Sequence, residues 1–149
     1  MEIQVDYICV IRILNVWVYP PSSKGDYPLI NNIGEYMGYT NYWHQDMDFT
    51  DKQWKAVQEE VEYMQEMGDS TISVIRNDDK EIAINGNPTC ETFVLTRYKP
   101  DTPEYEGQDL TFNCCKTREL PYDIYVWHIL VFCAGMINNT DKFSISRDR

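Results

Sequence analysis

The chain has 149 residues, the usual size of one domain, and its 24 acidic and 13 basic residues give a formal charge of −11. Binding to nucleic-acid phosphates or anionic membranes relies on clustered Lys and Arg, so this charge excludes both direct functions. The five cysteines have no zinc-type spacing and favour a reducing compartment. The start lacks the basic region of a signal peptide, and no apolar run can span a bilayer. We expect one cytoplasmic domain over residues 1–149, without a cofactor.

The first part of the chain contains one strand-like stretch and one long irregular stretch. Residues 8–19 are dense in β-branched and aromatic side chains, which predicts a long strand or a bent pair of strands. Pro20-Pro21 ends it. Residues 20–48 are punctuated by Pro and Gly, which predicts an irregular segment that includes at most a short helix around 33–37. Structureless segments of this length are often functional.

A helix is predicted over residues 51–67. Thr50 and Gln53 have the spacing of a capping box, and Phe49 and Trp54 have that of a hydrophobic staple. Gly68 is the expected end. Apolar side chains recur every three or four residues along one face: Trp54, Val57, Val61 and Met64. The opposite face carries Glu59, Glu60, Glu62 and Glu66.

The rest of the chain predicts mostly strands and one apolar helix. Residues 70–76 and 81–85 read as a β-hairpin, because alternating stretches flank a polar turn. The helix at 121–137 has Pro121 in its first turn, and it is apolar nearly all round. Further strands are expected at 92–98, 110–115 and 142–146. This order predicts an α+β fold in which a mainly antiparallel sheet is packed by two helices, at about 51–67 and 121–137.

Aromatic rings alternate with polar groups in residues 36–48 and form the first candidate site. Rings can stack on a planar ligand while polar groups fix its orientation. The basic residues that could hold an anion, near the N-terminus of the 121–137 helix, are Arg97, Lys99, Lys116 and Arg118. Together these features predict a site for a nucleotide-like small molecule. Its expected ligand-binding residues are Tyr39, Tyr42, Trp43, His44, Lys116 and Arg118. In the alternative interpretation, the rings fill the core and the cations pair with acids of residues 101–109.

Two catalytic or metal-binding arrangements are weaker candidates. His44, Asp46 and Asp48 are metal-ligating residue types, although three ligands so close in sequence rarely converge, and an acidic turn before the helix is the alternative. Cys115 lies near basic residues at the expected start of a helix, which could lower its pKa so that it acts as the nucleophile of a small hydrolase, with His128 as the base. The alternative is a core histidine at position 128. No established catalytic motif occurs, and we assign no catalytic or metal-binding residue.

The helix at 51–67 carries the third candidate site. From Asp46 to Asp69 there are eight acidic residues and only two basic ones, Lys52 and Lys55. Such a run is usually a solvated face, but it can also be a docking surface for a basic partner. In that case the expected partner-binding residues are Glu59, Glu62 and Glu66.

A short pattern near the end of the chain resembles one in a group of known proteins. Residues 112–123 read FNCCKTRELPYD, which is similar to a Cys-Lys-Thr-x-x-x-Pro-Tyr-Asp segment of small uncharacterised proteins encoded by bacteriophages. The resemblance covers the last third of the chain. It implies a viral origin and a host-cell cytosolic location, and it supplies no catalytic residue.

The resulting functional hypothesis is a non-enzymatic, phage-encoded accessory factor that inhibits or sequesters a host component, such as a defence protein. The alternatives are capture of a nucleotide-like small molecule and a small hydrolase using Cys115 or His44. The aromatic content also makes a homodimer plausible.

Overall fold

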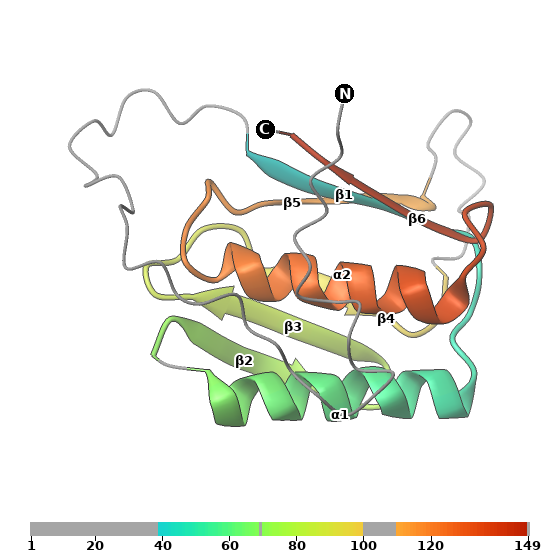
Figure 1. Ribbon diagram of the computed structural model, residues 1–149, viewed down its shortest axis with the longest axis horizontal. Coiled ribbons are helices and arrows are strands. Elements are labelled where there is room, and N and C mark those ends of the chain that lie inside the picture. Colours follow the sequence, from blue (N-terminus) through green and yellow to red (C-terminus); the bar gives the residue numbers. More distant parts are fainter. Residues whose placement is uncertain (1–38, 69, 100–109, 149) are drawn as a thin grey trace. The chain divides into compact units, whose positions relative to one another are not determined.

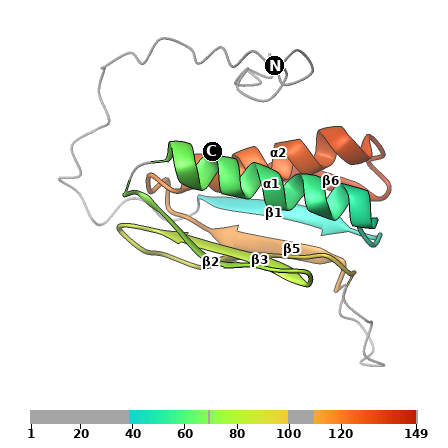
Figure 2. The same cartoon turned by 90° about the horizontal axis from the view of Figure 1, so that it is seen from below.

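The computed structural model describes residues 39–68, 70–99 and 110–148, which form two helices and six strands (Figure 1). The predicted α+β class is confirmed. The strands make two antiparallel three-stranded sheets, and both helices lie on the same side of them (Figure 2). The predicted strand at 8–19 and the short helix around 33–37 lie outside the described residues.

β1, Thr40–Gln45, runs through the stretch predicted to be irregular. The prediction is wrong for this part of residues 20–48, and positions up to 38 lie outside the described residues. Asn41 and Gln45 share the buried face of β1 with Trp43. Because two of the three buried side chains are polar, the strand lacks the apolar alternation by which half-buried strands are predicted.

α1, Asp51–Met67, has the predicted bounds and the predicted start. The Thr50 hydroxyl accepts a hydrogen bond from the Gln53 backbone N–H, and the Gln53 side chain accepts one from the Thr50 N–H. The rings of Phe49 and Trp54 lie 5.5 Å apart, which confirms the staple. The four predicted apolar residues are buried, but so is Glu60, which was wrongly expected on the polar face.

One sheet has the strand order β2–β3–β4. The predicted hairpin at 70–85 and the predicted strand at 92–98 are confirmed. The carboxylate of Asp78 closes the hairpin turn by accepting backbone hydrogen bonds from residues two and three positions later. A β-bulge lies between Val74 and Arg76. The bounds are Ile72–Asn77 for β2, Glu81–Gly86 for β3 and Phe93–Thr96 for β4.

The other sheet has the order β5–β1–β6, so its central strand comes first in the sequence. β5 is Phe112–Lys116 and β6 is Phe143–Arg147, close to the predicted strands. Both strands are antiparallel to β1: Tyr42 faces Cys114 on one side and Ser146 on the other.

α2, Asp123–Ile137, begins two residues later than predicted. Pro121 and Tyr122 form a turn, and the buried Tyr122 is the N-cap residue. The helix ends at Asn138, whose backbone is left-handed with a φ of 48°. Most of the predicted apolar surface of α2 is covered, because the helix packs against α1, β1 and β6.

One apolar core is shared by the two sheets and the two helices. The ring of Trp43 in β1 packs on that of Phe93 in β4, with centroids 5.1 Å apart. Gln45 Nε2 donates a hydrogen bond of 2.9 Å to the carbonyl of Thr96. Side chains of β1 therefore connect the two sheets.

Candidate functional site

The six predicted ligand-binding residues do not form one cluster. Because side chains alternate along a strand, β1 directs Trp43 and its two neighbours to opposite faces. Trp43 is 3% exposed and belongs to the core, as the alternative interpretation expected. Tyr42 and His44 lie on the face of the β5–β1–β6 sheet that points away from the core. We call this the outer face. It also carries Phe112, Cys114, Lys116, Ser144 and Ser146.

The outer face contains one aromatic pair. The rings of Tyr42 and Phe112 stack with centroids 5.7 Å apart and an interplanar angle of 24°. Phe112 is 53% exposed, so part of its ring is accessible to a planar ligand. The Tyr42 hydroxyl donates a hydrogen bond of 2.8 Å to Asp148, and this bond to a carboxylate raises the pKa of Tyr42. Sequence reasoning missed Phe112, because only the register with β1 brings it beside Tyr42.

The predicted concentration of positive charge is divided between the two ends of β1. Lys116 lies opposite Thr40, at the start of β1. The Arg118 backbone N–H donates to the carbonyl of Tyr39, which places both residues at that same end. The remaining two cations lie beyond the other end of β1, where Arg97 pairs with Asp51 and Lys99 with Asp46. The four cations therefore do not converge on one anion.

A buried polar cluster holds the corner between β5 and α2. The Asp123 carboxylate, in the first turn of α2, accepts hydrogen bonds from Thr117 and from Asn41 Nδ2, the latter at 2.7 Å. Arg147 Nη1 lies 3.6 Å from the same carboxylate, and its guanidinium is 4.4 Å from the Trp127 ring centroid. An anion at this helix N-terminus would meet a negative charge that is already there.

The residues that carry the bacteriophage resemblance have structural roles at this corner. The Cys115 thiol donates to the carbonyl of Glu91 at 3.6 Å, and the Tyr122 hydroxyl donates to the same carbonyl at 2.7 Å. Thr117 and Asp123 bond to each other across the turn. The pattern thus contains the hydrogen-bonding groups that fix the path from β5 into α2.

The environment of Cys115 is the opposite of what a nucleophile requires. Its side chain is 1% exposed. Burial, followed by the negative charge of Glu91, raises the pKa of the thiol to about 12. The expectation of a lowered pKa is therefore wrong, since only the thiolate is an effective nucleophile.

His128, the proposed base, is a buried histidine in contact with α1. Its Nε2 lies 2.7 Å from Oε1 of Glu60, which is 1% exposed. Interpretation as a core histidine is confirmed.

The three metal-ligating residue types near the end of β1 diverge. His44 lies on the outer face, opposite Phe112 and Ser144. Asp46 lies within 4.0 Å of two lysine ammonium groups, and Asp48 accepts the backbone N–H of Lys99. In the part of the chain that the structure describes, no three His, Cys, Asp or Glu residues are grouped to hold a metal ion.

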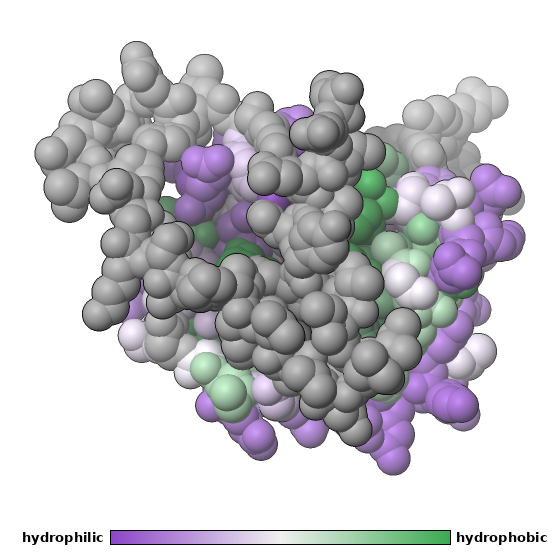
Figure 3. Space-filling model, in the orientation of Figure 1, coloured by the Kyte–Doolittle hydropathy of each residue, from purple (hydrophilic) through white to green (hydrophobic). Residues whose placement is uncertain are grey.

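The acidic face of α1, defined by Glu59, Glu62 and Glu66, is exposed as predicted. Figure 3 shows hydrophilic residues along the lower margin of the view, where α1 lies. Glu59 is near Lys55, with Nζ and Oε1 3.9 Å apart. Within the described residues, Glu62 and Glu66 form no ion pair or side-chain hydrogen bond.

The positions of Glu62 and Glu66 are unfavourable for α1 itself. They are four residues apart and therefore adjacent on the helix surface, where like charges repel. Glu66 lies in the last turn, where the helix macrodipole favours cations, and this turn contains no basic residue. The helix thus carries charges that oppose its own formation.

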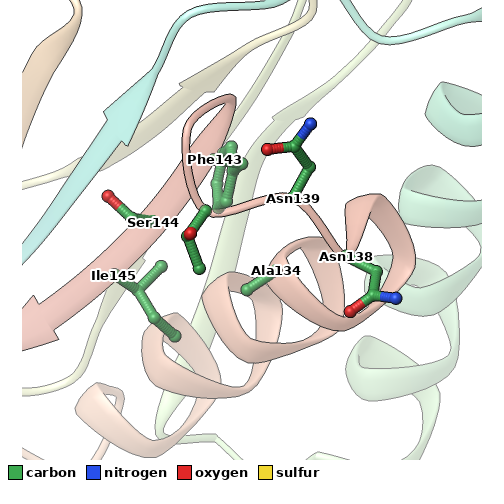
Figure 4. A pocket seen from close by; sticks show the side chains of 7 residues that line it. Ala134, Asn138, Asn139, Phe143, Ser144 and Ile145 are labelled. Carbon is green, nitrogen blue, oxygen red and sulfur yellow. The ribbon is translucent and has the colours of Figure 1, made fainter.

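An open cavity of about 480 Å³ lies between the C-terminal end of α2 and β6 (Figure 4). Its apolar lining comes from Ala134, Phe143 and Ile145. The polar lining comes from Asn138, Asn139, Thr140 and Ser144. None of the predicted ligand-binding residues lines this cavity.

No protein-family model, curated protein or solved structure matches the chain. Among the described residues, neither helix has the length and apolarity needed to cross a membrane.

Proposed function

We propose that this chain is a non-enzymatic binding protein that attaches to a basic surface of another protein through the acidic face of α1. The observation that supports this is the state of Glu62 and Glu66: they are exposed, without an ion-pair partner among the described residues, and disfavoured by their own helix. A basic partner would neutralise both carboxylates and remove their repulsion. The net charge of −11 would also speed the encounter with such a partner.

The resemblance of residues 112–123 to small bacteriophage proteins points to a component of the host cell as the partner. Binding by contact alone inhibits such a component if the acidic face covers its basic functional surface. We therefore propose sequestration of a host protein, with a defence component as the most relevant class.

The experiment compares capture from host lysate by the wild type and by the Glu62→Lys/Glu66→Lys variant. The matched control is Asp79→Lys/Asp141→Lys, which changes the net charge equally at two exposed carboxylates that are not part of α1. We expect one host protein to be retained by the wild type and the control, to be lost with the α1 variant, and to be released by high salt. Equal capture by the two variants, or no captured protein, contradicts the proposal.

The second candidate function is binding of a planar, nucleotide-like small molecule on the outer face. The stacked rings of Tyr42 and Phe112 support it, because a planar ligand can stack on them. Lys116 and His44 lie on the same face, where they can contact the polar groups of such a ligand. A ligand at 100 times its dissociation constant would stabilise the fold by about 2.7 kcal/mol.

A thermal-shift screen with nucleosides and nucleotides tests this candidate. The shift should disappear in Phe112→Ala and persist in Ile75→Ala, which removes an apolar side chain of similar exposure. A shift that survives Phe112→Ala places the ligand elsewhere, and the absence of any shift removes this candidate.

A further inference from the structure

In the described part of the chain, the two sheets have four outer strand edges, and three of these carry a feature that hinders pairing with another strand. On β4, the Thr96 carbonyl already accepts the side chain of Gln45. At the end of β5, the Lys116 N–H donates to the Glu91 carboxylate at 2.7 Å, and the Lys116 carbonyl accepts the Glu91 N–H. β2 contains a β-bulge. Such features protect edges that would otherwise act as templates for a further strand.

The edge of β6 is different. The Asp46 N–H donates to the carbonyl of Lys142, and the Asp148 N–H donates to that of Thr40. These two bonds fix which residues of β6 face β1, so Ile145 and Arg147 direct their N–H and C=O groups away from β1. No hydrogen bond from another described residue reaches these four backbone groups. β6 also contains no proline and no bulge.

The cavity at the end of α2 lies beside this open edge (Figure 4). Phe143 and Ile145 line it from β6, and Ala134 lines it from α2. A strand added at the edge would direct alternate side chains to the same face as Ile145. The cavity offers space for the side chain that lies directly beside Ile145.

We propose that β6 binds an extended segment of a partner protein, which adds to the sheet as an antiparallel strand. The partner residue opposite Ile145 exchanges two backbone hydrogen bonds with it and places an apolar side chain in the cavity. Lys142 and Asp148 lie three positions before and after Ile145. Lys142 faces an acidic residue of the partner segment, and Asp148 faces a basic one. The recognised segment therefore has an apolar residue at its centre, a basic residue three positions before it and an acidic residue three positions after it. This inference does not depend on α1 and goes beyond the function proposed for it.

A second copy of the chain carries the same pattern, because β6 itself reads KFSISRD from Lys142 to Asp148. Pairing of two copies about a twofold axis would place both α2 helices on one face of the joined sheet. Because α2 packs against β6, the two helices would lie side by side across the joined edge and would have to fit each other. A segment without such a helix meets no such restriction, and it is the occupant that we propose.

The test uses two synthetic peptides, acetylated and amidated at their ends, as probes of the full chain. One has the sequence KFSISRD, and the other, DFSISRK, exchanges the terminal charges. Titration is followed by amide resonances. We expect shifts and slowed exchange at the Ile145 and Arg147 amides, with little change at Ser144 and Ser146. The charge-exchanged peptide should bind at least tenfold more weakly.

Two variants separate the backbone from the side chain. Ile145→Pro removes the outward N–H and should abolish binding, whereas Ile145→Ala keeps it and should weaken binding less. If Ile145→Pro does not fold, the comparison of the two peptides on the wild type decides. No binding, equal binding of both peptides, or shifts confined to other residues overturns the proposal. A wild-type dimer in light scattering that Ile145→Ala preserves and Ile145→Pro disrupts would replace the partner segment by a second copy.

Discussion

At the scale of single residues, the neighbours Cys114 and Cys115 have different environments. Cys114 is exposed on the outer face, whereas Cys115 is 1% exposed and points into the core. Strand alternation alone produces this difference. The raised pKa of Cys115 follows from it, because an apolar environment disfavours the thiolate.

We expect alkylation at pH 8 to modify Cys114 and to leave Cys115 unmodified in the native protein. A pKa of about 12 in place of 9.0 lowers the thiolate fraction at that pH by about a thousandfold, and burial also blocks access of the reagent. Iodoacetamide labelling with tandem mass spectrometry assigns the modified residue. Labelling of Cys115 in a folded Cys114→Ser variant, at a rate like that of a free thiol, would contradict this expectation.

The buried contact between Glu60 and His128 is a second feature of this scale. Removal of one member of a buried ionisable pair takes this contact away from the other, so Glu60→Leu should destabilise the fold by about 3–5 kcal/mol. The double variant Glu60→Leu/His128→Leu should lose less free energy of unfolding than the two single variants lose together. Urea unfolding measures all three free energies. Strict additivity would mean that the two side chains are not coupled.

At the scale of elements, α1 has a favourable start and an unfavourable end. The capping box and Asp51 satisfy the first turn, while the last turn carries Glu66 and no cation. We expect Glu66→Lys to raise the free energy of unfolding by about 0.5–1 kcal/mol, because it removes repulsion with Glu62 and complements the macrodipole. Thr50→Ala should lower it by about 1 kcal/mol. Equal signs of the two changes, measured in urea, would contradict this account.

The difference between α1 and β1 explains which elements the sequence predicts. The signals for α1 are local: Thr50, Gln53 and the apolar stripe lie within one short segment. β1 has two polar side chains, Asn41 and Gln45, on its buried face. Their hydrogen-bond partners are Asp123, 82 residues away, and the carbonyl of Thr96, 51 residues away. A local pattern contains no information on such partners, so the strand resembled a polar loop.

The candidate sites follow the same rule. Exposure of Glu59, Glu62 and Glu66 was predictable, because it depends on helical periodicity alone. The pairing of Phe112 with Tyr42 depends on the register between β1 and β5, which sequence spacing does not reveal. The position of β6 at the edge of the sheet that the described residues form was not predictable either, because it depends on the strand order.

At the scale of the whole molecule, the burial of protonated thiol and phenol groups makes the stability of the fold sensitive to alkaline pH. Burial raises the pKa of Cys115 to about 12 and also raises those of Cys133 and Tyr122. Above the unfolded pKa values of 9.0 for the thiols and 10.0 for tyrosine, the unfolded chain binds fewer protons than the folded one. The stabilisation that these groups contribute is therefore fully present below about pH 9. It is lost as the pH rises towards their pKa values in the folded protein.

We expect the urea midpoint to fall steadily between pH 9 and 11, and the fall to be shallower in Cys115→Ala. The comparison at pH 7 separates the loss of packing in that variant from the proton linkage. An identical slope for the wild type and the variant would show that Cys115 does not contribute to the alkaline transition.

The position of β1 at the centre of the β5–β1–β6 sheet has a consequence for synthesis on the ribosome. β1 is synthesised before both of its neighbours, and its partner β6 lies about a hundred residues later in the sequence. The hairpin β2–β3 needs only nearby residues and can form while translation continues. Tyr42 and Trp43 gain their neighbours in β6 only after residues 143–147 have been synthesised. A nascent polypeptide stalled before Phe143 would leave one side of β1 unpaired, a substrate for chaperones and proteases.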